Sequence, residues 1–279
     1  MSMKKLMAGL MVLALGATMA SATPMRTTMT LENAMPEQFM PEIGVDVFGY
    51  ALSDLPHGID GFDVDVWEWD INARLGLLDS LALTLEVPFI SWDADTAIPL
   101  PDGKGFSDGE AGLGHVALGL QWRPWEDIFD YVWIIPHAQL FFPTGDKDKY
   151  LGTGDVDAKL GVSVGTTVED DWHFAVDGSW VAADMVDPIT FVTEDHGAFL
   201  GSVSIMYDLF SDMIDGQASI FAEGSYLTYS SDPDEHGRAR AQAGISYASD
   251  CGLTTALYGG GQSGDGEGGF GGIRMVYGF

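Results

Sequence analysis

From about residue 42 onward, apolar and polar side chains alternate along the chain. In WEWDINARLGL the apolar residues take every second position from Trp67 to Leu77, and polar or small residues fill the positions between them. The pattern recurs in DVDAKLGVSVGT, which begins at Asp155, and in RARAQAGISY, which begins at Arg238. Because successive side chains of a strand point to opposite faces, sustained alternation predicts β-strands and not amphipathic helices.

Alternating segments of this kind number about twelve, and they predict an all-β fold. Their polar face carries charges of both signs, whereas the opposite face is apolar. The predicted strands are 42–51, 66–78, 80–91, 112–124, 130–142, 155–168, 171–182, 197–209, 215–229, 238–249, 252–260 and 269–279.

The connections between these segments alternate in length. Short turns lie near 78–80, 126–130, 169–171, 209–215 and 249–252. Long polar loops lie at 52–65, 92–111, 143–154, 183–196, 230–237 and 260–268, and these loops carry close to half of the 42 acidic residues. An even strand number, short turns at one end and long loops at the other are typical of a closed antiparallel transmembrane β-barrel.

A secreted β-sandwich would also alternate, but three features favour the barrel. The predicted strands run to roughly ten residues, which suits a tilted membrane crossing, whereas strands of soluble proteins usually have about five or six. Near-balanced charges on one face suit a polar interior. Aromatic residues gather at strand ends, as expected of girdles at the membrane surfaces: Trp67, Trp69, Trp122, Trp125, Tyr131, Trp172, Trp180, Tyr207 and Phe210.

The last segment, GGIRMVYGF, ends on an aromatic residue with apolar side chains at every second position. A barrel in lipid needs every backbone group paired, so this strand is expected to close the barrel against the first strand. Tyr277 and Phe279 also resemble the C-terminal signature by which bacterial outer-membrane proteins are recognised for insertion. The resemblance implies outer-membrane lipids and the barrel-assembly machinery as partners.

The N-terminus predicts export. Lys4 and Lys5 precede an apolar run at 6–20, and Ala20-Ser21-Ala22 is a small-residue cleavage site, so residues 1–22 form a signal peptide. Residues 23–40 would then be a periplasmic or plug segment, and 41–279 the barrel in the outer membrane of a Gram-negative cell. Removing two lysines moves the net charge from −30 to −32, which argues against a nucleic-acid partner.

Inward parity selects the candidate lumen residues. The predicted polar lining is Glu68, Asp70, Arg74, Arg123, Asp157, Lys159, Asp177, Glu223, Arg238, Arg240 and Arg274. We expect its arginines to face acids such as Glu68, Asp70, Asp177 and Glu223, which would set a transverse field across a constriction. Toward the loop end, inward parity predicts an apolar mouth formed by Phe48, Tyr50, Ile90, Trp92 and Tyr258.

The stretch FFPTGDKDKYLGTGDVDAKLGVSVG contains a recognisable motif at Pro143, Gly145, Asp146, Gly152, Gly154 and Asp157. It is similar to the Pro-x-Gly-Asp … Gly-x-Gly-x-x-Asp segment of a family of outer-membrane transporters associated with the meta-pathway of phenol degradation. The resemblance implies a barrel that passes small molecules, aromatic ones among them. The alternative is a glycine-rich surface loop that needs these residues only for its turns.

Other chemistry finds little support in the sequence. Cys251 is the only cysteine, so neither an intrachain disulfide nor a zinc ligand set is expected. DPDEHG, which begins at Asp232, starts like an EF-hand, but Ala243 stands where the bidentate glutamate should be. The acidic loops leave two interpretations open: weak binding of Ca²⁺ or Mg²⁺, or adaptation to a saline habitat.

An enzyme is not expected either. The pattern G-x-S-x-G occurs at 105–109, in a predicted loop, and at 161–165, inside a predicted strand, and neither place is the strand-to-helix turn that a nucleophilic serine needs. The inward His115, His137 and His173 are interpreted as members of a polar lumen network. We therefore expect a channel for passive passage of small solutes, with aromatic or hydrophobic molecules among the candidates and no cofactor. The alternative is a non-conducting structural or surface-interaction barrel that displays acidic loops.

Overall fold

A computed structural model shows the fold. It describes residues 38–53, 63–99, 106–128, 132–149, 151–152, 154–169, 171–182, 198–209, 216–229, 238–264 and 267–279. The predicted signal peptide and residues 23–37 of the predicted plug segment lie outside the described residues. Residues 38–40 lie beside the end of a strand, where the Phe39 backbone N–H donates to the Gly76 carbonyl over 2.7 Å.

Twelve antiparallel strands form a closed barrel, as the alternation predicts. Around it they follow the order β1, β2, β3, β5, β7 and then β8 to β14, and β14 pairs with β1. The strands are β1 (Pro41–Ser53), β2 (Val64–Leu78), β3 (Leu81–Pro99), β5 (Val116–Trp122), β7 (Val132–Phe142), β8 (Asp157–Val168), β9 (Trp172–Val181), β10 (Ala198–Leu209), β11 (Gly216–Tyr229), β12 (Arg238–Ser249), β13 (Leu253–Ser263) and β14 (Glu267–Gly278).

Two short strands and one helical turn complete the described structure. β4 (Phe106–Leu113) pairs with the far end of β3, and β6 (Trp125–Ile128) pairs with β7. The 3₁₀ turn η1 (Lys147–Lys149) lies between β7 and β8. In the described part of the chain, no helix is both long and apolar enough to cross a membrane.

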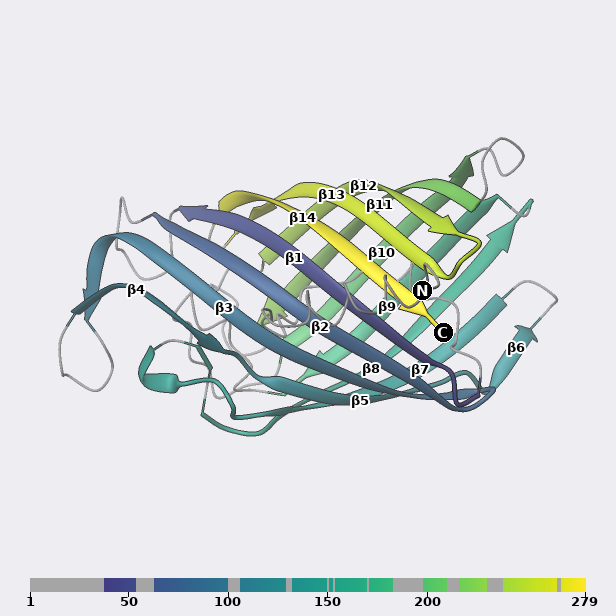
Figure 1. Ribbon diagram of the computed structural model, residues 1–279, viewed down its shortest axis with the longest axis horizontal. Coiled ribbons are helices and arrows are strands. Elements are labelled where there is room, and N and C mark those ends of the chain that lie inside the picture. Colours follow the sequence, from purple (N-terminus) through teal and green to yellow (C-terminus); the bar gives the residue numbers. More distant parts are fainter. Residues whose placement is uncertain are drawn as a thin grey trace, which may run out of the picture.

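Closure follows the predicted pairing of the last strand with the first. Ile43 lies opposite Tyr277, and Tyr50 opposite Phe270, in one continuous register. Figure 1 shows β14 alongside β1, with the C-terminus at the short-turn end of the barrel. This pairing leaves neither terminal strand with an open edge, which the hydrocarbon core of a membrane requires.

Two predicted loops are shorter than expected. β3 runs on to Pro99 and pairs with β4 at Phe106, so much of the predicted loop 92–111 is a hairpin that extends β3 (Figure 1). In this hairpin the inward residues Trp92 and Ala94 are buried, while Asp93 is exposed. The polar side chains therefore face outward here, whereas in the membrane-spanning part of the strands they face inward. The predicted loop 260–268 is also mostly strand, because Gln262 pairs with Gly268; its glycines hide the alternation.

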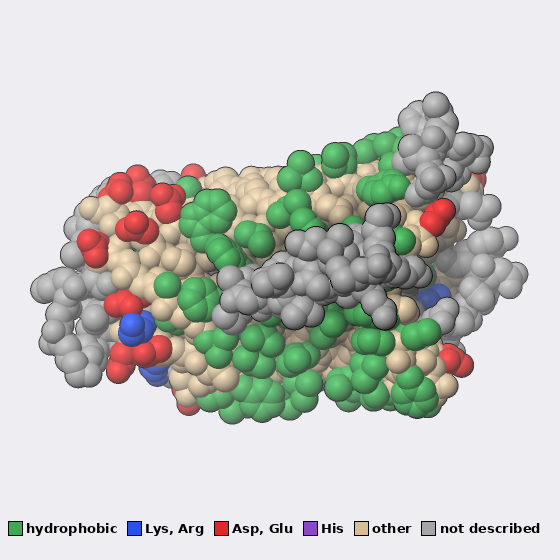
Figure 2. Space-filling view, in the orientation of Figure 1, with side chains coloured by type: hydrophobic (Ala, Val, Ile, Leu, Met, Phe, Trp, Pro, Cys, Tyr) green, Lys and Arg blue, Asp and Glu red, His purple; other side chains and the backbone are tan. Residues whose placement is uncertain are grey.

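The outer surface of the barrel is apolar. Figure 2 shows hydrophobic side chains in a broad band along the middle of the barrel, with carboxylates gathered at its ends. An apolar patch of this extent is far larger than soluble proteins expose to water, and it matches the apolar band of a barrel in a bilayer. Its exposed members include Trp67, Trp69, Leu85, Leu118, Leu120, Trp122, Leu140, Leu160, Val162, Val164, Trp172, Phe174, Val176, Trp180, Phe199, Val203, Ile220, Tyr226, Ile245, Leu257 and Met275.

Candidate functional site

The inner face of the barrel is where charge is buried. Asp46, Glu68 and Asp70 are fully buried side chains on β1 and β2. Asp46 lies directly opposite Asp70 on one side and Arg274 on the other, so acid and base share one level of the wall. The Tyr258 hydroxyl donates to Asp46 Oδ1 over 2.6 Å. This part of the lumen wall is thus a fixed polar network.

A second polar network centres on Asp177 of β9. Its Oδ2 lies 2.6 Å from His137 Nε2 and accepts a hydrogen bond from the Ser163 hydroxyl over 2.8 Å. Its Oδ1 accepts from the Ser179 hydroxyl over 2.5 Å. The carboxylate is nearly buried, so three neighbours satisfy a charge that would be costly to leave unpaired.

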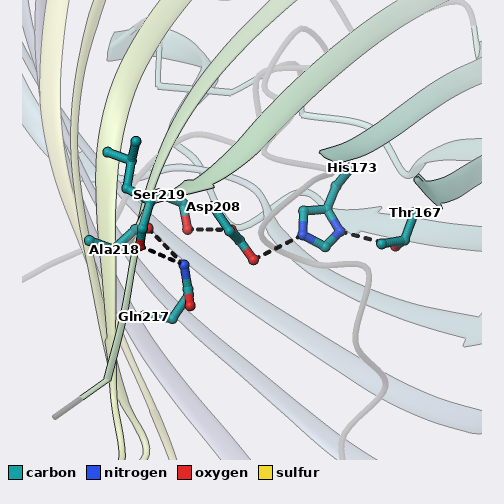
Figure 3. A network of polar contacts seen from close by, with 7 residues as sticks. Thr167, His173, Asp208, Gln217, Ala218 and Ser219 are labelled. Carbon is teal, nitrogen blue, oxygen red and sulfur yellow. Dashed lines mark hydrogen bonds and ion pairs between the residues drawn. The ribbon is translucent and has the colours of Figure 1, made fainter. Parts of the chain in front are cut away.

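A third network joins side chains of β8, β9, β10 and β11 near the short turns of these strands, and Figure 3 shows how its members point toward one another. Thr167 Oγ1 lies 3.0 Å from His173 Nδ1, and His173 Nε2 lies 3.1 Å from Asp208 Oδ2. The Ser219 hydroxyl donates to Asp208 Oδ1 over 2.6 Å. His137 and His173 therefore both belong to polar lumen networks.

An apolar wall interrupts the polar lining. One buried cluster contains Val64, Val66, Ile90, Trp92, Ala94 and Leu151. Another contains Phe48, Met206, Phe221, Ala256 and Tyr258, with Phe270 packed against it. Tyr50 packs against both clusters, and its ring stacks on Phe48 at 5.7 Å between centroids. The two clusters thus form one apolar wall, with the Arg240 guanidinium 3.8 Å from the Phe270 ring centroid.

The inward aromatic rings lie flat because glycines stand opposite them. Gly165 faces Trp133, Gly244 faces Phe221, and Gly272 faces both Phe48 and Tyr258 in the strand register. A β-carbon on Gly272 would lie 2.5 Å from Phe48 Cβ and 2.7 Å from Tyr258 Cζ. The absent side chains therefore let large rings rest against the wall instead of projecting across the lumen.

Gly165→Ala tests this arrangement, because a β-carbon at this position would collide with the Trp133 indole. We expect a loss of about 1–3 kcal/mol in the free energy of unfolding, as for other overpacked sites, together with a lower single-channel conductance. Gly178→Ala is the control, since its β-carbon would meet only Phe199 Cζ at 3.4 Å. Equal stability and conductance for the two variants would contradict the role assigned to Gly165.

The segment between β7 and β8 folds against the barrel wall. We call its described residues 143–149, Leu151 and Gly152 the strap. The Thr144 hydroxyl donates to the Gly114 carbonyl over 2.5 Å and accepts from the Val116 backbone N–H over 2.9 Å. These bonds bridge the break in the wall between β4 and β5 and fix the start of the strap there.

The motif found in the sequence builds the turns of the strap. The Asp146 carboxylate accepts from the Asp148 backbone N–H over 3.0 Å. The backbone carbonyl of Asp146 accepts from the Lys149 and Leu151 backbone N–H groups. Gly145 leaves room for the Leu151 carbonyl, and Gly154 has a φ of 88°. Gly145, Asp146 and Gly154 thus act through turn geometry, and the turn at Asp146 directs Leu151 inward.

The strap is anchored to the β3–β4 hairpin by two polar contacts. The Trp92 indole N–H donates to the Lys149 carbonyl over 3.1 Å, and Lys149 Nζ lies 2.7 Å from Glu110 Oε2. The hydrogen bond with Glu110, followed by its charge, raises the pKa of Lys149 above the usual value. Lysine therefore stays charged, although an exposed pair of this kind adds little stability.

The predicted lining residues do not gather at one level. Arg74 binds Glu42 at 2.6 Å near the short turns, and Arg123 follows β5 at the same end. Arg238 and Arg240 begin β12 at the opposite end, whereas Arg274 lies opposite Asp46. Glu223 accepts from Gln242 over 2.5 Å, and Asp157 and Lys159 lie at the start of β8. The transverse field across one constriction stays a prediction.

The five residues of the predicted apolar mouth all contribute to the apolar wall. Sequence reasoning missed the other members of the wall, which are Val64, Val66, Ala94, Leu151, Met206, Phe221, Ala256 and Phe270. Phe221 has the same inward parity as Glu223, so alternation alone could have selected it. Leu151 lies outside any strand, so no periodicity points to it. Among the described residues, no group of three or more His, Cys, Asp or Glu is placed to hold a metal.

A closed sheet with an apolar exterior and a charged, hydrogen-bonded interior defines a transmembrane β-barrel of the outer-membrane type. No protein-family model and no curated protein matches the sequence. Among solved structures, the chain is similar to an outer-membrane channel from Pseudomonas putida F1, with a TM-score of 0.59 and 14% identity over 88% of this chain and 97% of that one.

Two further solved structures share the fold. The CymD monoaromatic hydrocarbon channel gives a TM-score of 0.50 and 9% identity over 87% of this chain and 89% of that one. The β domain of the Bordetella autotransporter BrkA gives 0.54 and 12% over 86% and 100%. A channel and an autotransporter domain resemble this chain about equally, so the likeness establishes the fold alone. The function has to be argued from the residues that line the lumen.

Proposed function

We propose that this protein is a passive outer-membrane channel for small, largely apolar solutes, monoaromatic molecules among them. The observation that carries the proposal is the continuous apolar wall from Leu151 through Tyr50 to Met206. A purely structural barrel could fill this space with polar networks. An apolar wall beside polar networks instead offers a solute several weak contacts along one path, which favours passage over retention.

We also propose membership of the outer-membrane transporter family associated with the meta-pathway of phenol degradation. The support is the motif at 143–157, whose residues form the turns that bring the strap onto the wall. The channels found among the structural relatives agree with transport and not catalysis as the role of the barrel. Cleavage of residues 1–22 and recognition of Tyr277 and Phe279 during insertion belong to the same proposal.

A second candidate function is a non-conducting barrel. The buried acids of β1 and β2 and the inward strap favour it, because inward side chains can fill a barrel of this size. Under this alternative the acidic loops would be the functional surface. The two candidates differ in a single property, which is whether solutes and ions pass.

The test joins two measurements on the protein without its signal peptide. Single-channel conductance and reversal potential are recorded in a planar bilayer under a salt gradient. Uptake of a radiolabelled monoaromatic and of a sugar of similar size is then compared in Gram-negative cells that make the barrel. We expect discrete conductance and faster uptake of the monoaromatic than of the sugar. Folded, inserted protein that gives neither current nor uptake would exclude the channel.

A further inference from the structure

The Leu151 side chain occupies an apolar seat in the inner wall. Only 1% of its surface is exposed, and its neighbours are Val64, Val66, Ile90, Trp92 and Ala94. Its Cδ1 also lies 2.7 Å from the place where Gly112 would carry a β-carbon. The strap thus supplies a side chain that the wall itself lacks, in a seat shaped by three strands and one glycine.

The seat suits a ligand as well as it suits Leu151. Apolar cavities lined by aliphatic and aromatic side chains stay dry and bind small rings such as benzene. The seat also offers a hydrogen-bond donor, the Trp92 indole N–H, which donates to the Lys149 carbonyl while the strap is docked. If the strap leaves, that donor becomes available to a ligand together with the space vacated by Leu151.

Among the described residues, few polar contacts hold the end of the strap that carries Leu151. In the part of the chain that the structure describes, the polar contacts of the strap with the β3–β4 hairpin are the Trp92 hydrogen bond and the ion pair between Lys149 and Glu110, both made by Lys149. Gly152, which follows Leu151, lies close to His115. The firm attachment lies at the other end of the strap, where Thr144 bridges Gly114 and Val116. Because the strap joins the barrel ladder only at Phe142 and Asp157, its middle can move away from the wall without breaking any strand pairing.

We infer that Leu151 occupies a solute-binding site, so that solute and strap exclude each other there. The ligand is a small aromatic or branched aliphatic molecule with one hydrogen-bond acceptor, which takes the positions of the Leu151 side chain and the Lys149 carbonyl. Solute binding then releases the strap and widens the path along the apolar wall. This inference rests on the proposed channel function and specifies where its first binding step occurs.

The test uses Leu151→Ala, which empties the seat, in single-channel recordings with and without benzaldehyde or toluene. Wild-type protein is expected to conduct more in benzaldehyde, because the aldehyde oxygen can accept from Trp92, and less so in toluene, which has no acceptor. Leu151→Ala is expected to show a mean conductance raised by about twofold or more without any solute and little further response. Leu151→Met restores the wild-type behaviour, and Val156→Ala, which truncates an exposed residue beside the strap, changes nothing.

Trp92→Phe keeps an aromatic ring, although a smaller one, and removes the indole N–H donor, so it should abolish the preference for benzaldehyde over toluene even if Leu151→Ala fails to fold. Wild-type current that is the same with and without both solutes, and unchanged in Leu151→Ala, would overturn this inference and leave the channel intact. Absence of current from every folded variant would overturn the channel and the inference together.

Discussion

Val176→Arg is expected to lower the free energy of unfolding of the barrel in lipid vesicles by about 2–4 kcal/mol. Val176 lies at the middle of β9, exposed on the outer face, with Val164 and Val203 directly opposite it on the neighbouring strands. An arginine here would sit near the bilayer midplane, where that cost has been found for lipid-facing positions of other barrels. The shift is measured by guanidinium unfolding followed through tryptophan fluorescence.

Two companion variants isolate the contribution of the lipid. Val156→Arg places the same side chain at an exposed position just before β8, near the loop end, and is expected to stay within about 0.5 kcal/mol of the wild type. Val176→Leu keeps an apolar surface and is expected to be equally mild. If Val176→Arg were as stable as Val156→Arg, the outer band of the barrel would not be in hydrocarbon.

The predictions for Val176→Arg and Val156→Arg depend on which face of each strand points outward, and the sequence already contains that information. Along β2, Trp67 and Trp69 are exposed while Glu68 and Asp70 are buried, as alternation requires of a barrel in lipid. The strand count follows from the same signal, and the pairing of β14 with β1 follows from closure, because a sheet in lipid can leave no open edge. The alternation does not predict that β3 continues past Trp92, because in the sequence its outward-facing carboxylates resemble those of a polar loop.

The strap could not be predicted for a different reason. The inward position of Leu151 depends on the Asp146 turn, on room at Gly145 and Gly112, and on a seat made by β2 and β3. Gly145 and Asp146 are near Leu151 in the sequence, but Gly112 and the residues of β2 and β3 are far from it, so no local pattern relates Leu151 to its seat. The arginines show the same limit: parity places Arg74 and Arg274 on the inner face, but the register between strands decides that they lie at different levels.

Asp177→Ala is expected to lower the free energy of unfolding by about 3–5 kcal/mol, because it removes the shared acceptor of a buried network. His137 Nε2 and the Ser163 and Ser179 hydroxyls would all lose the carboxylate that they contact. Leaving a buried polar group without its partner costs about 1–3 kcal/mol. Asp177→Asn keeps the size and one acceptor oxygen, so its loss should be smaller, and a double-mutant cycle with His137→Ala gives the coupling between the two side chains.

Asp177→Asn also tests whether the Asp177 carboxylate affects ion permeation. If ions pass along the inner wall, removing the Asp177 charge should shift the reversal potential toward lower cation selectivity, since fixed lumen charges bias which ions enter. Asp171→Asn removes an equal charge from the exposed turn before β9 and should leave the reversal potential nearly unchanged. An equal shift for both variants would mean that selectivity reflects net charge alone, whereas a shift confined to Asp177 places the ion path beside the network of His137, Ser163 and Ser179.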